Sequence, residues 1–257
     1  MQTPYPETLE RVAAWRADPE VEAIVWIGSR SRGLAGDDAD DDLEVYLAPA
    51  AFALVDPLDS FVMEPAPGSD PPRLIYDAQL TTLAQLQAKA ASSSDPDHWT
   101  YERAQVLFDR TGVVTEAAKQ AAVMAPAFRR ARIQHGTLDA LIAVNRIKKS
   151  QRRGNEASTR MLVARAVKAL SRVVFALEGR WVPLDHWLEP ELRTLGGEAP
   201  LLLEGLLGSC YQPLQEALER LTPRLADEGF PATDRARFGA ELRHPARAAE
   251  RAIHGLD

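Results

Sequence analysis

Two aspartates that alternate along an extended segment, Asp40 and Asp42, are the residues whose types and spacing best suit chemistry on phosphate. Side chains two positions apart on a β-strand point to the same face of the sheet. Two carboxylates side by side supply the hard oxygen ligands that Mg²⁺ or Mn²⁺ binds, while waters and substrate phosphates fill the remaining positions. The pair therefore predicts a divalent metal site.

A turn of small residues, Gly28-Ser29, lies twelve residues before Asp40. Glycine lets the backbone approach an anion closely, and the neighbouring N–H groups and the serine hydroxyl can bind phosphate oxygens. Arg30 and Arg32 follow the turn and are alternative guanidinium ligands for the same phosphates. The turn predicts a phosphate site next to the metal site.

Two strands must position these residues. The apolar run 24–27 predicts a buried strand that ends at the turn, and the alternating segment 43–47 predicts a second strand that starts at the acidic pair. Asp42 and Glu44 also satisfy acid-x-acid, but Asp40 and Asp42 are preferred because Leu43, Val45 and Leu47 then face away from the carboxylates. The remaining acids are expected to be solvated loop charges or to add to the field that attracts the metal; they are Asp37, Asp38 and Asp41.

These residues resemble the motif of the nucleotidyltransferase superfamily that includes DNA polymerase beta, the aminoglycoside nucleotidyltransferases and the minimal nucleotidyltransferases. That motif reads Gly-Ser, a loop, then hydrophobic-Asp-x-(Asp/Glu)-hydrophobic, and the spacing here is similar to that of the aminoglycoside-modifying members. The resemblance implies that Gly28, Ser29, Asp40 and Asp42 form the nucleotide and metal site. It also implies Mg²⁺ or Mn²⁺ as the cofactor and a nucleoside triphosphate, ATP by expectation, as co-substrate.

The superfamily has a third carboxylate on a neighbouring strand, which helps to hold a metal or deprotonates the attacking hydroxyl. Asp77 is the position most similar to it, because it lies 35 residues beyond Asp42 on the strand-like segment 73–80. If 77–79 instead forms a hairpin turn, the strand that follows offers no acid. Glu64 is then the fallback ligand, and loss of the third carboxylate is the remaining alternative.

The resemblance implies transfer of a nucleoside monophosphate from the triphosphate to a hydroxyl of a small, aminoglycoside-like acceptor, with release of pyrophosphate. A pocket for cationic amines needs carboxylates, and the candidates are Glu44, Glu64 and Asp70. Two alternatives stay open. One is a nucleotide-binding or regulatory protein with a degraded site, and the other is nucleotidyl transfer to a protein or an RNA.

The resemblance implies an α+β fold with a nucleotidyltransferase domain over residues 1–112, a small mixed sheet flanked by helices. Periodicity predicts that the rest of the chain, 113–257, is an all-α helical bundle. In the first domain the expected elements are helices at 7–17 and from Thr81 or Thr82 to 91, a helical turn at 50–54, and strands at 23–28, 41–48, 60–63, 73–80 and 105–109. The stripe expected in the core of a helix over 160–177 is Val163, Val167, Leu170, Val174 and Leu177.

The charge is unevenly placed. Residues 1–100 hold 6 Lys and Arg against 18 Asp and Glu, whereas residues 101–257 hold 24 against 19. Arg165, Lys168 and Arg172 recur on one helix face, where they either meet the triphosphate or form a solvated basic face paired with local acids. A pI near 5.4 argues against nucleic acid as a partner.

Several classes of protein are excluded or disfavoured. There is no run of eighteen apolar residues and no basic-then-apolar start, so neither a membrane nor a secretory route is expected. The single cysteine, Cys210, rules out an internal disulfide and fits a cytoplasmic location. The P-loop and Gly-x-Ser-x-Gly patterns are missing, and the five histidines show no metal-ligand spacing.

Overall fold

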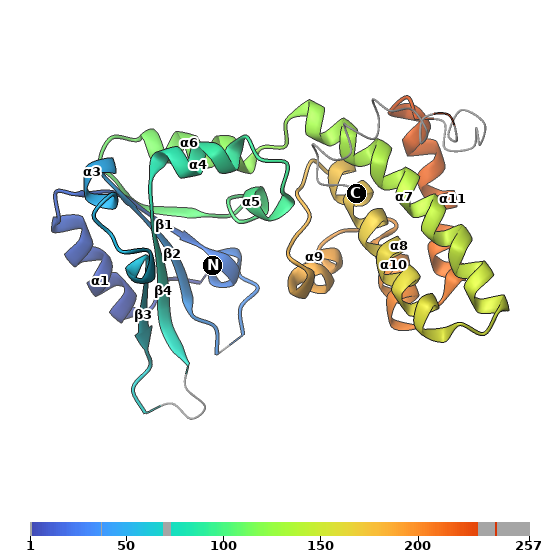
Figure 1. The fold of residues 1–257 in the computed structure, drawn as a ribbon, viewed down its shortest axis with the longest axis horizontal. Helices are drawn as coiled ribbons and strands as arrows, with labels where there is room; N and C mark the ends of the chain where they lie inside the picture. The colour runs from blue at the N-terminus through green and yellow to red at the C-terminus, as the bar shows by residue number, and fades with distance from the viewer. Residues whose placement is uncertain (1, 37, 69–72, 231–239, 241–257) are drawn as a thin grey trace. The chain divides into compact units, whose positions relative to one another are not determined.

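The computed structural model describes residues 2–36, 38–68, 73–230 and 240 (Figure 1). Contacts divide the chain into two compact units. The first contains Met1–Ser92 and Asp97–Val123, and the second contains Ser93–Pro96 and the chain from Met124 onward. None of the described helices is long and apolar enough to cross a membrane.

The first unit is built on a five-stranded mixed sheet in the order β3-β4-β2-β1-β5 (Figure 1). The parallel pair is β2 with β4, and the pairs β1–β2, β1–β5 and β3–β4 are antiparallel. The strands are β1 (Val21–Ile27), β2 (Asp41–Leu47), β3 (Phe61–Pro65), β4 (Leu74–Thr81) and β5 (Gln105–Asp109). All five predicted strands are therefore present, with ends that differ from the prediction by at most two residues.

Each face of the sheet is covered by helices. The first unit contains α1 (Pro6–Ala17), α2 (Gly28–Arg32), α3 (Pro49–Phe52), α4 (Leu83–Ala90), α5 (Asp95–Trp99, shared with the second unit at its start), α6 (Val113–Ala122) and the 3₁₀ turn Pro57–Asp59. One core joins Trp15 of α1 to Trp26 and Leu43, and the other joins Tyr46 to Leu86 of α4 and Ala117 of α6. Successive side chains of a strand point to opposite faces of the sheet, so β2 contributes Leu43 to one core and Tyr46 to the other.

Helix α4 begins where the Thr-rich segment predicted it. Thr82 is its N-cap, and the Thr82 side chain accepts a hydrogen bond from the Gln85 N–H while the Gln85 side chain accepts one from the Thr82 N–H. This reciprocal capping box satisfies backbone groups that a helix start otherwise leaves unpaired. The cap fixes the direction in which the chain leaves β4.

The second unit is helical. It contains α7 (Pro126–Arg152), α8 (Glu156–Leu177), the 3₁₀ turn Asp185–Trp187, α9 (Leu188–Arg193), α10 (Ala199–Leu207) and α11 (Tyr211–Asp227). The predicted stripe of α8 is buried except for Leu177, which is partly exposed. Helices α7 and α8 approach closely at Gly136, where an added Cβ would lie 2.9 Å from Val173 Cγ2 and 3.0 Å from the Ala169 oxygen.

The division between the units falls one helix later than the expected boundary at residue 112. Helix α6 packs against α4 and contributes Val114, Ala117 and Ala121 to the core of the first unit. The sequence shows the change to helical periodicity at this point, but it does not show which core a helix joins.

Candidate functional site

Gly28 begins α2 directly after β1 and has the positive φ of +78° that favours glycine. A Cβ at this position would lie 1.7 Å from Oδ2 of Asp42, so the backbone of the turn rests against that carboxylate. The backbone N–H of the next residue, Ser29, donates a hydrogen bond to Asp42. The predicted turn and the predicted acid are therefore in direct contact.

Asp77 lies opposite Asp42 in the register of the parallel strands β4 and β2. Segment 77–79 lies inside one continuous strand, so the hairpin alternative is wrong. Glu64 pairs with Tyr76, whose side chain belongs to the α1 core, and therefore lies on the other face from Asp77. Of the two candidates for the third acid, Asp77 is the one next to the pair.

Negative charge accumulates at these three aspartates. The pKa of the Asp42 carboxyl is raised to about 7, mainly by burial and then by the charges of Asp77 and Asp40, against the lowering effect of the Ser29 N–H. Burial and the charge of Asp40 also raise the pKa of Asp77. Carboxylates arranged in this way are stabilised by a cation placed among them.

The donor set fits a hard divalent ion, because all three groups are carboxylates. Within the described parts of the chain, no group of three or more acidic, histidine or cysteine side chains is arranged so that it could hold a metal ion by itself. Mg²⁺ does not require one, since it retains several waters and takes one or two carboxylates together with substrate phosphates. The arrangement therefore fits a site in which carboxylates and substrate phosphates bind the metal together, better than a structural metal site.

Asp41 corrects the expectation of a solvated loop charge. Its carboxylate is fully buried and accepts hydrogen bonds from the Tyr5 N–H (2.7 Å), the Thr8 hydroxyl (2.7 Å) and Arg30 Nε (2.8 Å). It occupies the same face of β2 as Leu43, so it points into the α1 side of the sheet. Asp41 thus holds α1 and α2 against the sheet.

The two predicted phosphate-binding arginines have partners inside the protein. Besides Asp41, Arg30 donates to the Thr3 carbonyl at 2.9 Å and lies over the Tyr5 ring. Arg32 is 4% exposed, donates from Nη1 to the Trp99 carbonyl at 2.8 Å, and lies over the Trp99 ring. These contacts favour a structural role for both guanidinium groups.

Glu44, the alternative to Asp40 in the motif, is 1% exposed. Its carboxylate accepts hydrogen bonds from Tyr46 Oη (2.5 Å), Tyr101 Oη (2.7 Å) and Lys89 Nζ (2.5 Å). With three donors, this carboxylate is satisfied inside the protein. The network joins β2 to α4 and to the segment that follows α5, and sequence inspection missed it because Tyr101 and Lys89 belong to no motif.

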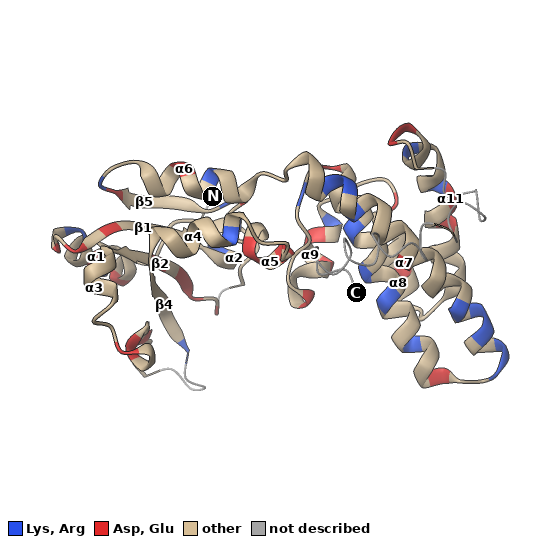
Figure 2. Ribbon diagram, turned by 45° about the horizontal axis from the view of Figure 1, so that its top comes forward, with Lys and Arg blue, Asp and Glu red and all other residues tan. Residues whose placement is uncertain are grey.

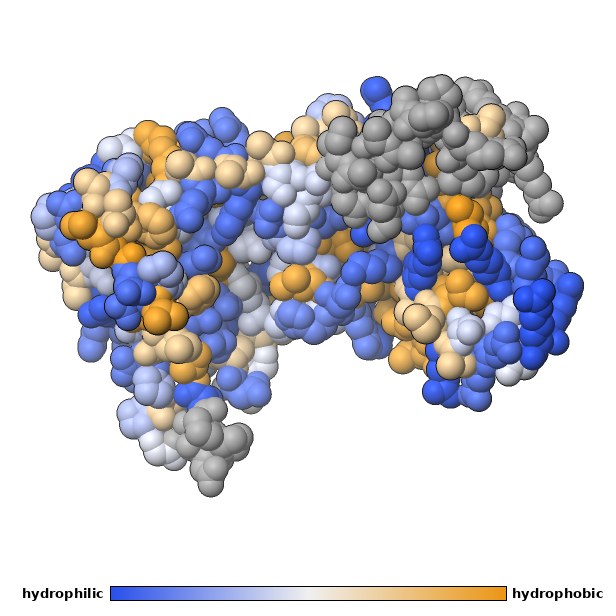
Figure 3. All heavy atoms as spheres, viewed as in Figure 1, coloured by the Kyte–Doolittle hydropathy of each residue, from blue (hydrophilic) through white to orange (hydrophobic). Residues whose placement is uncertain are grey.

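The edge strand β3 adds an apolar element beside the acids. Met63 pairs with Asp77 and Phe61 with Gln79, so both side chains share the face of Asp77. They are 61% and 52% exposed, respectively. Hydrophobic residues are visible among hydrophilic ones over the part of the unit where β3 lies (Figure 3).

Comparison with known proteins adds the following. A family described as a domain of unknown function, DUF4037, matches residues 98–188. A solved structure of a nucleotidyltransferase-like protein from Exiguobacterium sibiricum is 15% identical, covers 96% of this chain and 86% of that one, and has a TM-score of 0.45. No curated protein matches the sequence.

Proposed function

We propose that the chain is a metal-dependent nucleotidyltransferase that moves a nucleoside monophosphate from a nucleoside triphosphate to a hydroxyl of a small-molecule acceptor. The observation that carries the proposal is the register of Asp42 with Asp77, together with the turn at Gly28 that rests on Asp42. Two carboxylates on adjacent strands beside a glycine turn suit a charged phosphoryl-transfer transition state.

Asp40, Asp42 and Asp77 are the residues that would hold the divalent ions. When bound, these ions would neutralise the phosphates and stabilise the attacking and leaving oxygens. Backbone N–H groups after Gly28 and the Ser29 hydroxyl would bind the β and γ phosphates. Asp77 would accept the proton of the acceptor hydroxyl, whose oxygen bonds to the α-phosphorus as the bond to pyrophosphate breaks.

The identity of the acceptor belongs to the proposal as well. An aminoglycoside-like molecule would need carboxylates beside Asp77, but Glu44 is buried in its network and Glu64 lies on the other face. Asp70, the third predicted carboxylate, lies outside the described residues. Met63 and Phe61 instead favour an acceptor that combines its hydroxyl with an apolar part.

A nucleotide-binding protein without turnover is the second candidate. It is favoured by the contacts of Arg30 and Arg32, because guanidinium groups held within the protein do not neutralise a triphosphate. Metal-dependent nucleotide binding with no transfer would identify this function. The same experiment therefore separates the two candidates.

The test measures nucleotide binding and pyrophosphate release with Mg²⁺ and ATP, GTP, CTP or UTP. Each is assayed with and without a panel of aminoglycosides, sugar alcohols and aromatic alcohols. The double variant Asp40→Asn/Asp42→Asn should lose metal-dependent binding, while Glu64→Gln, a carboxylate change on the opposite face, should behave as wild type. Pyrophosphate release by wild type with one acceptor supports transfer, and equal nucleotide binding by wild type and the double variant contradicts the site.

A further inference from the structure

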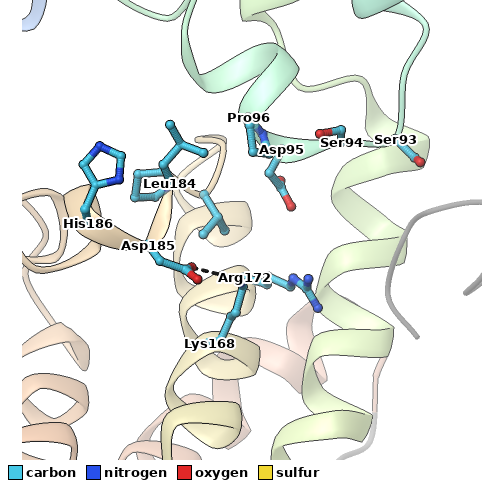
Figure 4. A pocket seen from close by; sticks show the side chains of 11 residues that line it. Ser93, Ser94, Asp95, Pro96, Lys168, Arg172, Leu184, Asp185 and His186 are labelled. Atoms are coloured by element: carbon cyan, nitrogen blue, oxygen red, sulfur yellow. Dashed lines mark hydrogen bonds and ion pairs between the residues drawn. The ribbon is translucent and has the colours of Figure 1, made fainter. Parts of the chain in front are cut away.

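The helical unit contains a cavity of about 520 Å³. Its walls are the segment Ser93–Pro96, one face of α8 and the segment 182–186 (Figure 4). A second cavity of about 390 Å³ shares Lys168 and Arg172 with the first. Arg172 therefore lines both cavities. Both cavities include residues of α8, and Figure 2 shows many Lys and Arg residues on the helices of this unit.

Each carboxylate near these cavities already has a cationic partner. Arg132 Nε lies 2.6 Å from Oδ1 of Asp95. The other two pairs are Arg165 Nη2 with Asp139 Oδ1 at 3.2 Å and Lys168 Nζ with Asp185 Oδ1 at 2.8 Å. These three pairs balance their own charges and leave Arg172 as the additional cation.

Arg172 is partly buried, and this burial lowers the pKa of its guanidinium from the usual value. The charges of Asp95, Asp139 and Asp185 act in the opposite direction and help to keep the group charged. Among the described residues, none forms a hydrogen bond or ion pair with this guanidinium. A partly buried guanidinium whose five N–H donors have no partner among the described residues is stabilised when an anion binds it.

We propose that the helical unit binds a small oxyanion, the carboxylate or phosphate group of a small molecule, in the cavity lined by Arg172 and Lys168. Arg172 supplies the planar pair of N–H donors that suits both kinds of anion. Lys168, one helical turn away, adds positive charge while retaining its contact with Asp185. A cavity of this size is within the range that small ligands occupy.

This cavity shares no residue with the proposed transferase site, since every residue that lines it belongs to the helical unit. A ligand held there would neutralise Arg172 and bridge the segment 93–96 to α8. The proposal requires neither a metal nor nucleotide chemistry. It can therefore be correct even if the proposed transfer reaction is not.

The test is calorimetric titration of the full chain with inorganic phosphate and, separately, with succinate. EDTA keeps the aspartate site free of metal, and chloride holds the ionic strength constant. We expect saturable binding of at least one probe to wild type, and the probe that binds identifies the class of anion. Arg172→Gln should weaken binding at least about tenfold, because a charge-assisted hydrogen bond is lost.

Three further variants make the result specific. Arg165→Gln is the matched control, because Arg165 borders the smaller cavity and is held by Asp139; its binding should be within about twofold of wild type. Arg172→Lys keeps the charge without the planar fork and should bind with intermediate affinity, which also covers poor folding of Arg172→Gln. Asp42→Asn should bind as wild type. Absence of binding of both probes to wild type, or equal binding to Arg172→Gln, would overturn the proposal.

Discussion

Asp42 and Asp77 face each other across the parallel strands β2 and β4, and the backbone of Gly28 lies against the carboxylate of Asp42. Residues from three separate segments of the chain thus meet at one end of the sheet. Such a concentration of like charge lowers the stability of the folded protein unless a cation binds. The relationship can therefore be tested by stability as well as by activity.

The first prediction concerns the dependence of stability on pH without metal. The Asp42 pKa is about 7 in the folded chain and 3.8 in the unfolded chain, so between about pH 4 and 7 the folded state retains a proton that the unfolded state has lost. Stability should therefore fall as pH rises through this window. Asp42→Asn should be more stable than wild type by about 2 kcal/mol at pH 8 and nearly equal to it at pH 4.

Urea denaturation in EDTA at the two pH values measures this difference. Asp38→Asn, a change at an exposed carboxylate of the neighbouring loop, is the control and should leave stability within about 0.5 kcal/mol of wild type at both values. Addition of Mg²⁺ at pH 8 should stabilise wild type more than Asp42→Asn. If Asp42→Asn is the less stable protein at pH 8, the account of this carboxylate is wrong.

The second prediction concerns Gly28→Ala. The new methyl group would overlap the Asp42 carboxylate, and alanine would also have to adopt a φ of +78°. We expect a loss of about 3 kcal/mol in the free energy of unfolding, together with weaker metal-dependent nucleotide binding.

Gly33→Ala is the matched control for this change. Gly33 has a φ of +73°, but no atom lies within 4 Å of the position that its Cβ would take. It should cost only the backbone strain, about 1 kcal/mol, and leave nucleotide binding unchanged. Equal losses of stability and binding in the two variants would mean that the contact with Asp42 has no particular role.

The third prediction separates two neighbouring acids of the same run. Asp41→Ala should lower the free energy of unfolding by about 3 kcal/mol, because it leaves the buried Arg30 guanidinium without its carboxylate. Asp38→Ala, at an exposed position, should change it by less than about 0.5 kcal/mol. Thermal unfolding of the two variants side by side provides the measurement, and similar melting temperatures would contradict a structural role for Asp41.

Much of the first unit could be predicted because its strands have local signals. Alternation along 43–47 correctly placed Leu43 and Val45 on the face opposite Asp42. The same alternation places Asp41 on one face of the strand with Leu43 and Val45, so it also indicated that this carboxylate is buried, which the sequence analysis did not predict. A charged residue at such a position indicates a buried ion pair as well as a solvated loop.

The parts of the candidate site that could not be predicted depend on contacts between segments that are far apart in the sequence. The register that brings Asp77 opposite Asp42 results from pairing between β2 and β4, and no local pattern specifies it. The partners of Arg30 and Arg32 include Thr3 and Trp99, which are far from them in sequence. In the sequence, an arginine after a glycine turn looks the same whether it binds phosphate or forms a buried structural contact.

The fourth prediction concerns the cation at the wall of the helical unit's cavity. Because burial opposes the charge of Arg172 and none of the described residues pairs with it, Arg172→Met should raise the stability of the ligand-free protein by about 1 kcal/mol. Lys168→Met, which instead removes a cation from an exposed ion pair, should change stability by less than about 0.5 kcal/mol. Added phosphate or succinate should raise the melting temperature of wild type but not that of Arg172→Met. Strong destabilisation by Arg172→Met would show that the guanidinium is stabilised within the folded chain, and the reason for expecting an external anion would then be lost.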